Sequence, residues 1–256
     1  GDRRRELERS GIDAYWYLAM VTMTKGELLA SRGGPEEMEK AEKQATAILE
    51  QAVQADPTEP RAHINLLAMK LMLSKNNDPA KQKEQIEALE PEYLSLVSNF
   101  DSSAEAFAAM SQFYSAYSSF TGPRLGSEKL DKAIEAAEQA MRLDGQNVAY
   151  SISAANLYYR KYSLNSQKPK IYKAIEIAKN ALTLPDAQDK SGPRHRANIT
   201  NRFMLYAFLA NCYIEQILEP SEPENPSQMA VWMKGAEQAV HEIEQIFGSS
   251  EEPLII

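Results

Sequence analysis

The sequence predicts an all-α fold, built as a solenoid of about five antiparallel helix pairs. Apolar residues recur at the spacing of one helix face, as at Ala133, Ile134, Ala137, Ala140 and Met141. Gly and Pro gather mostly in short clusters between such segments. The stretch AIEAAEQAMRLD at 133–144 returns 41 residues later as AIEIAKNALTLP. Such a repeat is typical of stacked helix pairs, which cannot bury their apolar faces alone.

Breakers divide the chain into about ten helical segments. The stretch SRGGPEE at 31–37 ends the first helix and begins the second, with Pro35 suited to a first turn. DPTEP at 56–60 separates the second from the third, and Pro91 is expected to kink or break the fourth. Further breaks are FTGPRLGS, NSQKP, PDAQDKSGP and EPSEPENPS. The expected helices span 12–31, 35–55, 60–75, 79–99 (broken), 102–120, 127–143, 147–164, 169–184, 196–218 and 227–247.

Consecutive segments joined by short loops are expected to pair as antiparallel neighbours. We therefore expect one helical repeat domain over 1–256, with 248–256 as a tail. Its pairs are expected at 12–55, 60–99, 102–143, 147–184 and 196–247.

The second helices of these pairs end in a common register. Ala52, Val97, Ala140 and Ala181 occupy one small position at spacings of 45, 43 and 41 residues, and Val97 is the loosest match. Asp56, Asp101 and Asp144 follow the first three of these helices.

These junctions resemble those of tetratricopeptide repeats. Two features carry the resemblance. The second helix of a pair has small residues at fixed positions and a Pro after its end, and the first helix of a pair has a large residue followed by Leu, a small residue and an aromatic residue. The first feature is seen at Ala45, Ala52 and Pro57, at Ala133 and Ala140, and at Ala174 and Ala181; the second at Tyr206, Leu209, Ala210 and Tyr213. The period of 41–45 residues exceeds the family's roughly 34, Leu67 stands where a small residue is expected, and HEAT-like solenoids remain an alternative.

The resemblance implies a right-handed α-α superhelix whose first helices line a concave groove for a peptide or partner helix. Eight groove positions carry over: Trp16, Met20, Ile64, Gln112, Ser151, Tyr158, Tyr159 and Asn211. Few are charged or amide-bearing, so we expect apolar and aromatic contacts rather than a clamp for a peptide carboxylate. The alternative is that Trp16, Tyr158 and Tyr159 pack between neighbouring helices, and burial of all three would exclude an aromatic groove.

Composition argues against several functions. The net charge of −8 disfavours nucleic acid as a partner. No apolar run reaches the roughly 18–20 residues of a membrane helix, so no direct membrane insertion is expected. Phosphate loops, G-x-S-x-G, H-E-x-x-H and C-x-x-C are absent, and nothing brings the three His residues together. We therefore expect no enzyme activity, no metal and no cofactor, and a core role for Cys212.

Two other features leave alternatives open. Arg194, Arg196 and Arg202 form a possible basic patch, which would contact an acidic peptide or phosphate unless nearby Glu and water neutralise it. The apolar tail PLII or an uncapped end would suit a self-assembling scaffold and a homo-oligomer. The basic start GDRRRELER would fit a solvated helix or the remainder of a trimmed leader or anchor. The chain would accordingly be cytoplasmic, or an extracytoplasmic accessory region of a larger membrane-anchored or enzymatic protein.

Overall fold

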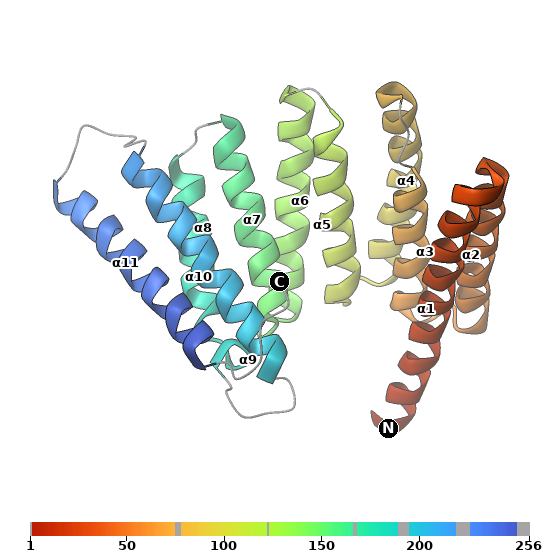
Figure 1. Cartoon of the computed structure of the whole chain (residues 1–256), viewed down its shortest axis with the longest axis horizontal. Helices are drawn as coiled ribbons and strands as arrows, with labels where there is room; N and C mark the ends of the chain where they lie inside the picture. Colours follow the sequence, from red (N-terminus) through yellow and green to blue (C-terminus); the bar gives the residue numbers. More distant parts are fainter. Residues whose placement is uncertain are drawn as a thin grey trace. The chain divides into compact units, whose positions relative to one another are not determined.

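The computed structural model describes residues 2–74, 78–121, 123–165, 168–188, 195–218 and 226–249, and side chains from residue 11 onward within most of these ranges. Throughout them the regular structure is helical, and Figure 1 shows the helices in chain order. They are α1 (Asp2–Gly33), α2 (Pro35–Ala55), α3 (Pro60–Leu73), α4 (Pro79–Asn99), α5 (Ala104–Ser119), α6 (Pro123–Leu143), α7 (Val148–Asn165), α8 (Lys168–Ala181), α9 (Pro185–Gln188), α10 (His195–Leu218) and α11 (Pro226–Ser249).

The predicted all-α class is confirmed, and three details differ. Helix α1 begins at Asp2 rather than at residue 12, and the short α9 precedes α10. The expected break at Pro91 was wrong, because α4 is one helix from Pro79 to Asn99. Pro91 and Glu87, whose carbonyl loses its helical partner, are both exposed, so water can satisfy that carbonyl.

The chain divides into two compact units, Gly1–Lys129 and Leu130–Ile256, with the boundary inside α6. In the first unit α1 packs along α2, and α1, α3 and α5 contact one another in sequence. In the second unit α7 packs along α8, α10 packs along α11, and α7 contacts α10. Within each unit, therefore, the first helix of a pair neighbours the first helix of the next, as in a stacked repeat.

A single residue, Gly34, connects α1 to α2. Its φ of 103° lies in the left-handed region that suits glycine, and this allows the chain to reverse within one residue. The two helices approach closely at Gly26, where an added Cβ would lie 2.2 Å from the Cβ of Ala41. Gly26 therefore permits the tight packing of α1 on α2.

Arg61 joins the three first helices of the first unit. Its guanidinium Nη1 lies 3.3 Å from Asp13 Oδ1 on α1, and its Nη2 lies 2.8 Å from Glu105 Oε1 on α5. The start of α3 is thus ion-paired to the helices on both sides.

The common register of the second helices is confirmed at Ala52 and Ala140, and one position of it shifts. The backbone N–H that caps each helix belongs to Asp56, Phe100 and Asp144, at equal spacings of 44 residues. The buried residue of α4 at the small position is therefore Leu96, and Val97 is only half-buried. Val97 matched poorly because it lies one residue out of register.

The duplicated stretch forms equivalent buried faces on α6 and α8, the second helices of two pairs. Six buried positions of α6 have buried counterparts on α8 at a spacing of 41 residues. They are Leu130 and Ile171, Ala133 and Ala174, Ile134 and Ile175, Ala136 and Ile177, Ala137 and Ala178, and Ala140 and Ala181. At the registers of Ala133, Ala137 and Ala140, α4 instead carries Leu89, Tyr93 and Leu96, which occupy more space.

A tyrosine and a lysine also recur between the two helices of a pair. Lys129 Nζ lies 5.5 Å from the ring centroid of Tyr114, and Lys170 Nζ lies 5.4 Å from that of Tyr158. Each tyrosine hydroxyl also donates to a glutamate of the preceding second helix in its unit, Tyr114 to Glu90 and Tyr158 to Glu138. These contacts combine cation–π attraction with charge-assisted hydrogen bonds.

Candidate functional site

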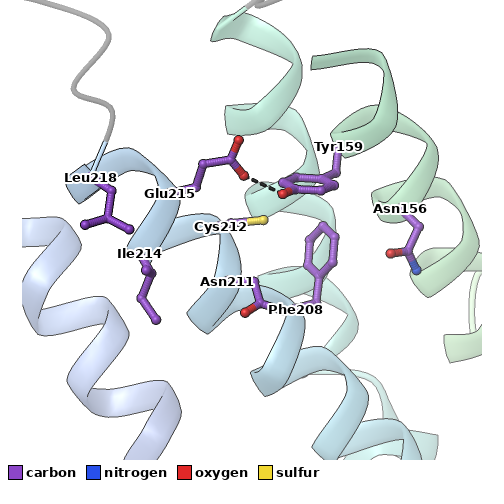
Figure 2. A pocket seen from close by; sticks show the side chains of 8 residues that line it. All are labelled: Asn156, Tyr159, Phe208, Asn211, Cys212, Ile214, Glu215 and Leu218. Atoms are coloured by element: carbon purple, nitrogen blue, oxygen red, sulfur yellow. Dashed lines mark hydrogen bonds between the residues drawn. The ribbon is translucent and has the colours of Figure 1, made fainter. Parts of the chain in front are cut away.

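A cavity of about 380 Å³ lies between the first helices of the second unit, α7 and α10 (Figure 2). Helix α7 contributes two residues and α10 the rest. Its lining consists of Asn156, Tyr159, Phe208, Asn211, Cys212, Ile214, Glu215 and Leu218. We refer to it below as the α7/α10 cavity.

Helical spacing places these side chains together. Asn156 and Tyr159 are three residues apart, and Phe208, Asn211 and Glu215 follow at steps of three and four. Residues at such spacings share one face of a helix. The two faces meet because α7 and α10 are in contact.

Tyr159 is the central aromatic residue of the cavity. Its ring meets that of Phe208 edge-on, with centroids 5.9 Å apart, and its hydroxyl donates a hydrogen bond to Glu215 Oε2 (Figure 2). The bond to Glu215, assisted by burial, raises the pKa of Tyr159 to about 12, so the hydroxyl remains a donor at neutral pH. The pair holds the Tyr159 ring in one orientation.

Two exposed amides lie at the cavity. The Asn156 side chain donates to the carbonyl of Ile152 on its own helix, at 3.0 Å, which leaves its oxygen as an acceptor. The Asn211 amide has no hydrogen-bond partner within the part of the chain that the structure describes. Both amides can therefore bond to the backbone of a ligand. Glu215 is the one formally charged residue among the described residues of the lining.

Cys212 is fully buried beneath this surface. Burial, together with the charge of Glu215, raises the pKa of its thiol to about 12. The thiolate is the nucleophilic and metal-binding form, so this cysteine is inert at neutral pH. The cavity is therefore suited to noncovalent binding.

The structure brings Tyr159 and Asn211, two predicted groove residues, to the α7/α10 cavity. Ile64 and Gln112 meet at a second cavity of about 360 Å³ between α3, α4 and α5. Ser151 lines a third, of about 530 Å³, mostly with residues of α6 and α8.

The other predicted groove residues lie elsewhere. Trp16 and Met20 are partly buried and pack against the core cluster of α1, α2 and α3. Tyr158 is 8% exposed, and its bond to Glu138 directs it away from the α7/α10 cavity. Burial of Trp16, Tyr158 and Tyr159 together would have excluded an aromatic groove. Trp16 and Tyr159 are partly exposed, so such a groove is not excluded.

The predicted basic patch is largely outside the described residues. Arg194 and the Arg196 side chain fall there, and Arg202 is paired at 3.6 Å with Glu242 of α11. The tail at 250–256 also lies outside the described residues. Among those described, no three His, Cys, Asp or Glu side chains gather as a metal ion requires. None of the described helices has the length and apolarity needed to cross a membrane.

Sequence reasoning missed Asn156, Phe208 and Glu215. The signal was available, because Asn156 precedes Tyr159 by three residues and Phe208 and Glu215 flank Asn211 by three and four. Extending each predicted residue along its helix face would have found them.

No protein-family model matches the chain, and no curated protein matches it. Solved structures do align with it. TTC0263, a thermophilic TPR protein of Thermus thermophilus, is 17% identical with a TM-score of 0.40 over 85% of this chain and 98% of that one. MamA is 14% identical with a TM-score of 0.39 over 84% and 95% of the two chains. The de novo designed helical repeat protein DHR64 is 12% identical with a TM-score of 0.25, over 95% and 99%.

The helices of the chain pack in neighbouring pairs, and buried positions of the second helices recur at spacings of 44 and 41 residues, which makes the fold a tetratricopeptide-like helical repeat.

Proposed function

We propose that the chain is a non-catalytic scaffold that binds a peptide or helix of a partner protein at the α7/α10 cavity. The supporting observation is the convergence there of an oriented aromatic ring, apolar side chains and two exposed amides. Ring and aliphatic groups supply binding energy, and amides fix the direction of a peptide backbone.

The charge of the lining restricts the ligand. Glu215 is half-buried and accepts a hydrogen bond from Tyr159, and none of the described residues that line the cavity is a cation. An acidic peptide would meet like charge both here and on a chain of net charge −8. The ligand that fits is a peptide with an aliphatic or aromatic anchor beside a Lys or Arg.

A random peptide library displayed on phage would test this proposal. Peptides selected on the wild-type chain should be enriched in a basic residue next to an apolar one. Anisotropy of a labelled selected peptide should show about tenfold weaker binding to Tyr159→Ala and Asn211→Ala, because each loses a direct contact. Glu215→Gln should weaken binding and flatten its dependence on salt.

Asn99→Ala is the matched control, because Asn99 is an exposed amide at the end of α4, outside this cavity. It should bind the peptide as the wild type does. Equal affinity of the wild type, Asn211→Ala and Glu215→Gln would overturn the proposal.

A second candidate function is self-association through α1. Its outer face carries exposed Tyr17 (68%), Leu18 (54%), Val21 (64%) and Leu28 (56%), which lie on one side of the helix. Large exposed apolar patches mark interaction surfaces, so a second copy of the chain would cover this one.

Sedimentation at several concentrations would test self-association. Leu18→Lys should shift an oligomer toward monomer, whereas Leu94→Lys, at an exposed leucine of α4 (47%), should not. A wild-type chain that is monomeric at all concentrations excludes this second function.

A further inference from the structure

The cavity between α3, α4 and α5 has the properties of a site for a small molecule. Its volume is about 360 Å³, and its residues all belong to the first unit. The lining is Ile64, Ala68, Leu71, Met72, Ser74, Gln82, Ile86, Tyr93, Ala109, Gln112, Ala116, Ser119 and Phe120. Ligand pockets have volumes of about 300–1,000 Å³ and are mostly apolar with a few polar groups, which describes this cavity.

The larger side chains of α4 explain why a cavity forms between α3, α4 and α5. At positions where α6 carries Ala133, Ala137 and Ala140, α4 has the larger Leu89, Tyr93 and Leu96. Tyr93 stacks on Phe113 of α5, with ring centroids 4.4 Å apart and 19° between planes. Larger side chains in this layer hold neighbouring helices further apart than alanines do.

Two buried polar side chains of the lining have no hydrogen-bond partner among the described residues. Tyr93 is 2% exposed and Gln82 is 8% exposed, and within the described residues neither the hydroxyl nor the side-chain amide bonds to another group. Buried polar groups are normally paired. Among the described residues, every side-chain oxygen or nitrogen that is fully enclosed has a hydrogen-bond partner. The Tyr93 hydroxyl and the Gln82 amide are therefore not fully enclosed by protein. Because both side chains are deeply buried, the space that these groups face is the cavity that they line.

Among the residues that the structure describes, no Asp, Glu, Lys or Arg lines the cavity. A charged ligand would lose hydration there without gaining an opposite charge. Burial raises the pKa of Tyr93, so its hydroxyl stays neutral and able to donate. The recognised chemistry is therefore uncharged hydrocarbon with a hydrogen-bonding group.

We propose that this cavity binds a small uncharged molecule, mostly aromatic or aliphatic, whose single hydroxyl, carbonyl or amide group bonds to Tyr93 and Gln82. A cavity of about 150 Å³ can hold benzene, so this one holds a molecule of about two rings. The site is separate from the α7/α10 cavity, and its occupancy does not depend on the function proposed for that cavity.

Calorimetric titration with 2-naphthol, naphthalene and 1-naphthalenesulfonate would test the proposal. The wild-type chain should bind 2-naphthol best, naphthalene about fivefold more weakly, and the sulfonate not measurably. Tyr93→Phe should keep the ring stacking on Phe113 but weaken 2-naphthol binding about fivefold, with naphthalene binding within twofold of the wild type.

Ala116→Leu fills the cavity and should abolish binding of both neutral probes. Ala88→Leu is the matched control, because Ala88 is exposed on α4 and lies outside the lining. A circular dichroism spectrum like that of the wild type would show that Ala116→Leu is folded. Absence of 2-naphthol binding to the wild type, sulfonate binding as strong as that of 2-naphthol, or unchanged binding to folded Ala116→Leu would overturn the assignment.

Discussion

Gly26 shows how one missing side chain controls the approach of two helices. A β-carbon at this position would lie 2.2 Å from the Cβ of Ala41, far inside contact distance. Gly26→Ala should therefore lower the free energy of unfolding by about 1–3 kcal/mol, although alanine is the better helix former. Urea unfolding followed by circular dichroism measures this change.

Gly11 provides the control on the same helix. Nothing lies within 4 Å of an added Cβ there, so Gly11→Ala should raise the free energy of unfolding by about 0.5–1 kcal/mol. If both substitutions stabilise the chain, the close packing of α1 on α2 is incorrect.

Cys212 links stability to alkaline pH. Burial raises its thiol pKa from 9.0 to about 12, so between these values the unfolded chain has lost a proton that the folded chain keeps. The free energy of unfolding should therefore fall as pH rises above about 9, by about 1.4 kcal/mol per pH unit for this proton.

Urea unfolding at pH 8, 9 and 10 would separate this effect from loss of packing. Cys212→Ala should lower the free energy of unfolding at every pH through lost packing. Because the variant has no thiol, its free energy of unfolding should also fall less steeply with rising pH than that of the wild type. Parallel curves for the two chains would contradict the assignment.

At the scale of the element, the second helices share a register but not a side-chain size. The fully buried Ala45 of α2 corresponds to Leu89 of α4, which is 8% exposed. Ala45→Leu should cost about 1–3 kcal/mol by overpacking, and Leu89→Ala about 2–5 kcal/mol by leaving a cavity. Ala47→Leu, at an exposed position of α2, should change the free energy of unfolding by less than about 0.5 kcal/mol. Comparable losses for Ala45→Leu and Ala47→Leu would show that burial does not set this register.

The elements were largely predictable because Gly or Pro lies at most of their boundaries and most carry a helical stripe. The Pro91 error arose because a proline rule ignores exposure, and here water can replace the lost hydrogen bond. The Val97 error arose because the helices were aligned by their small residues. In α4 the buried residue at the position of Ala52 and Ala140 is the larger Leu96, which such an alignment passes over. Helix caps, which are backbone features, fix the register to the residue.

The candidate sites were only partly predictable. Tyr159 and Asn211 were named from the sequence, and both line the α7/α10 cavity. Which of Tyr158 and Tyr159 faces outward depends on the rotation of α7, and the sequence of two adjacent aromatics does not reveal that rotation. The cavity between α3, α4 and α5 depends on how three helices pack around larger side chains, which no local pattern contains.

At the scale of the whole molecule, the two tryptophans are divided between the two units. Trp16 is partly buried in the first unit, and Trp232 is 7% exposed on α11 of the second. Trp16→Phe and Trp232→Phe would each leave one indole as a fluorescent reporter of its own unit.

Urea titrations of these two chains would show whether the units lose structure together. Packing between chain neighbours favours separate transitions, so the emission midpoints of the two reporters should differ after both are corrected for the substitution. Coincident midpoints would instead mean that the molecule melts as one cooperative body. Because each unit contains one indole, the intrinsic fluorescence of the chain can report the unfolding of each unit separately.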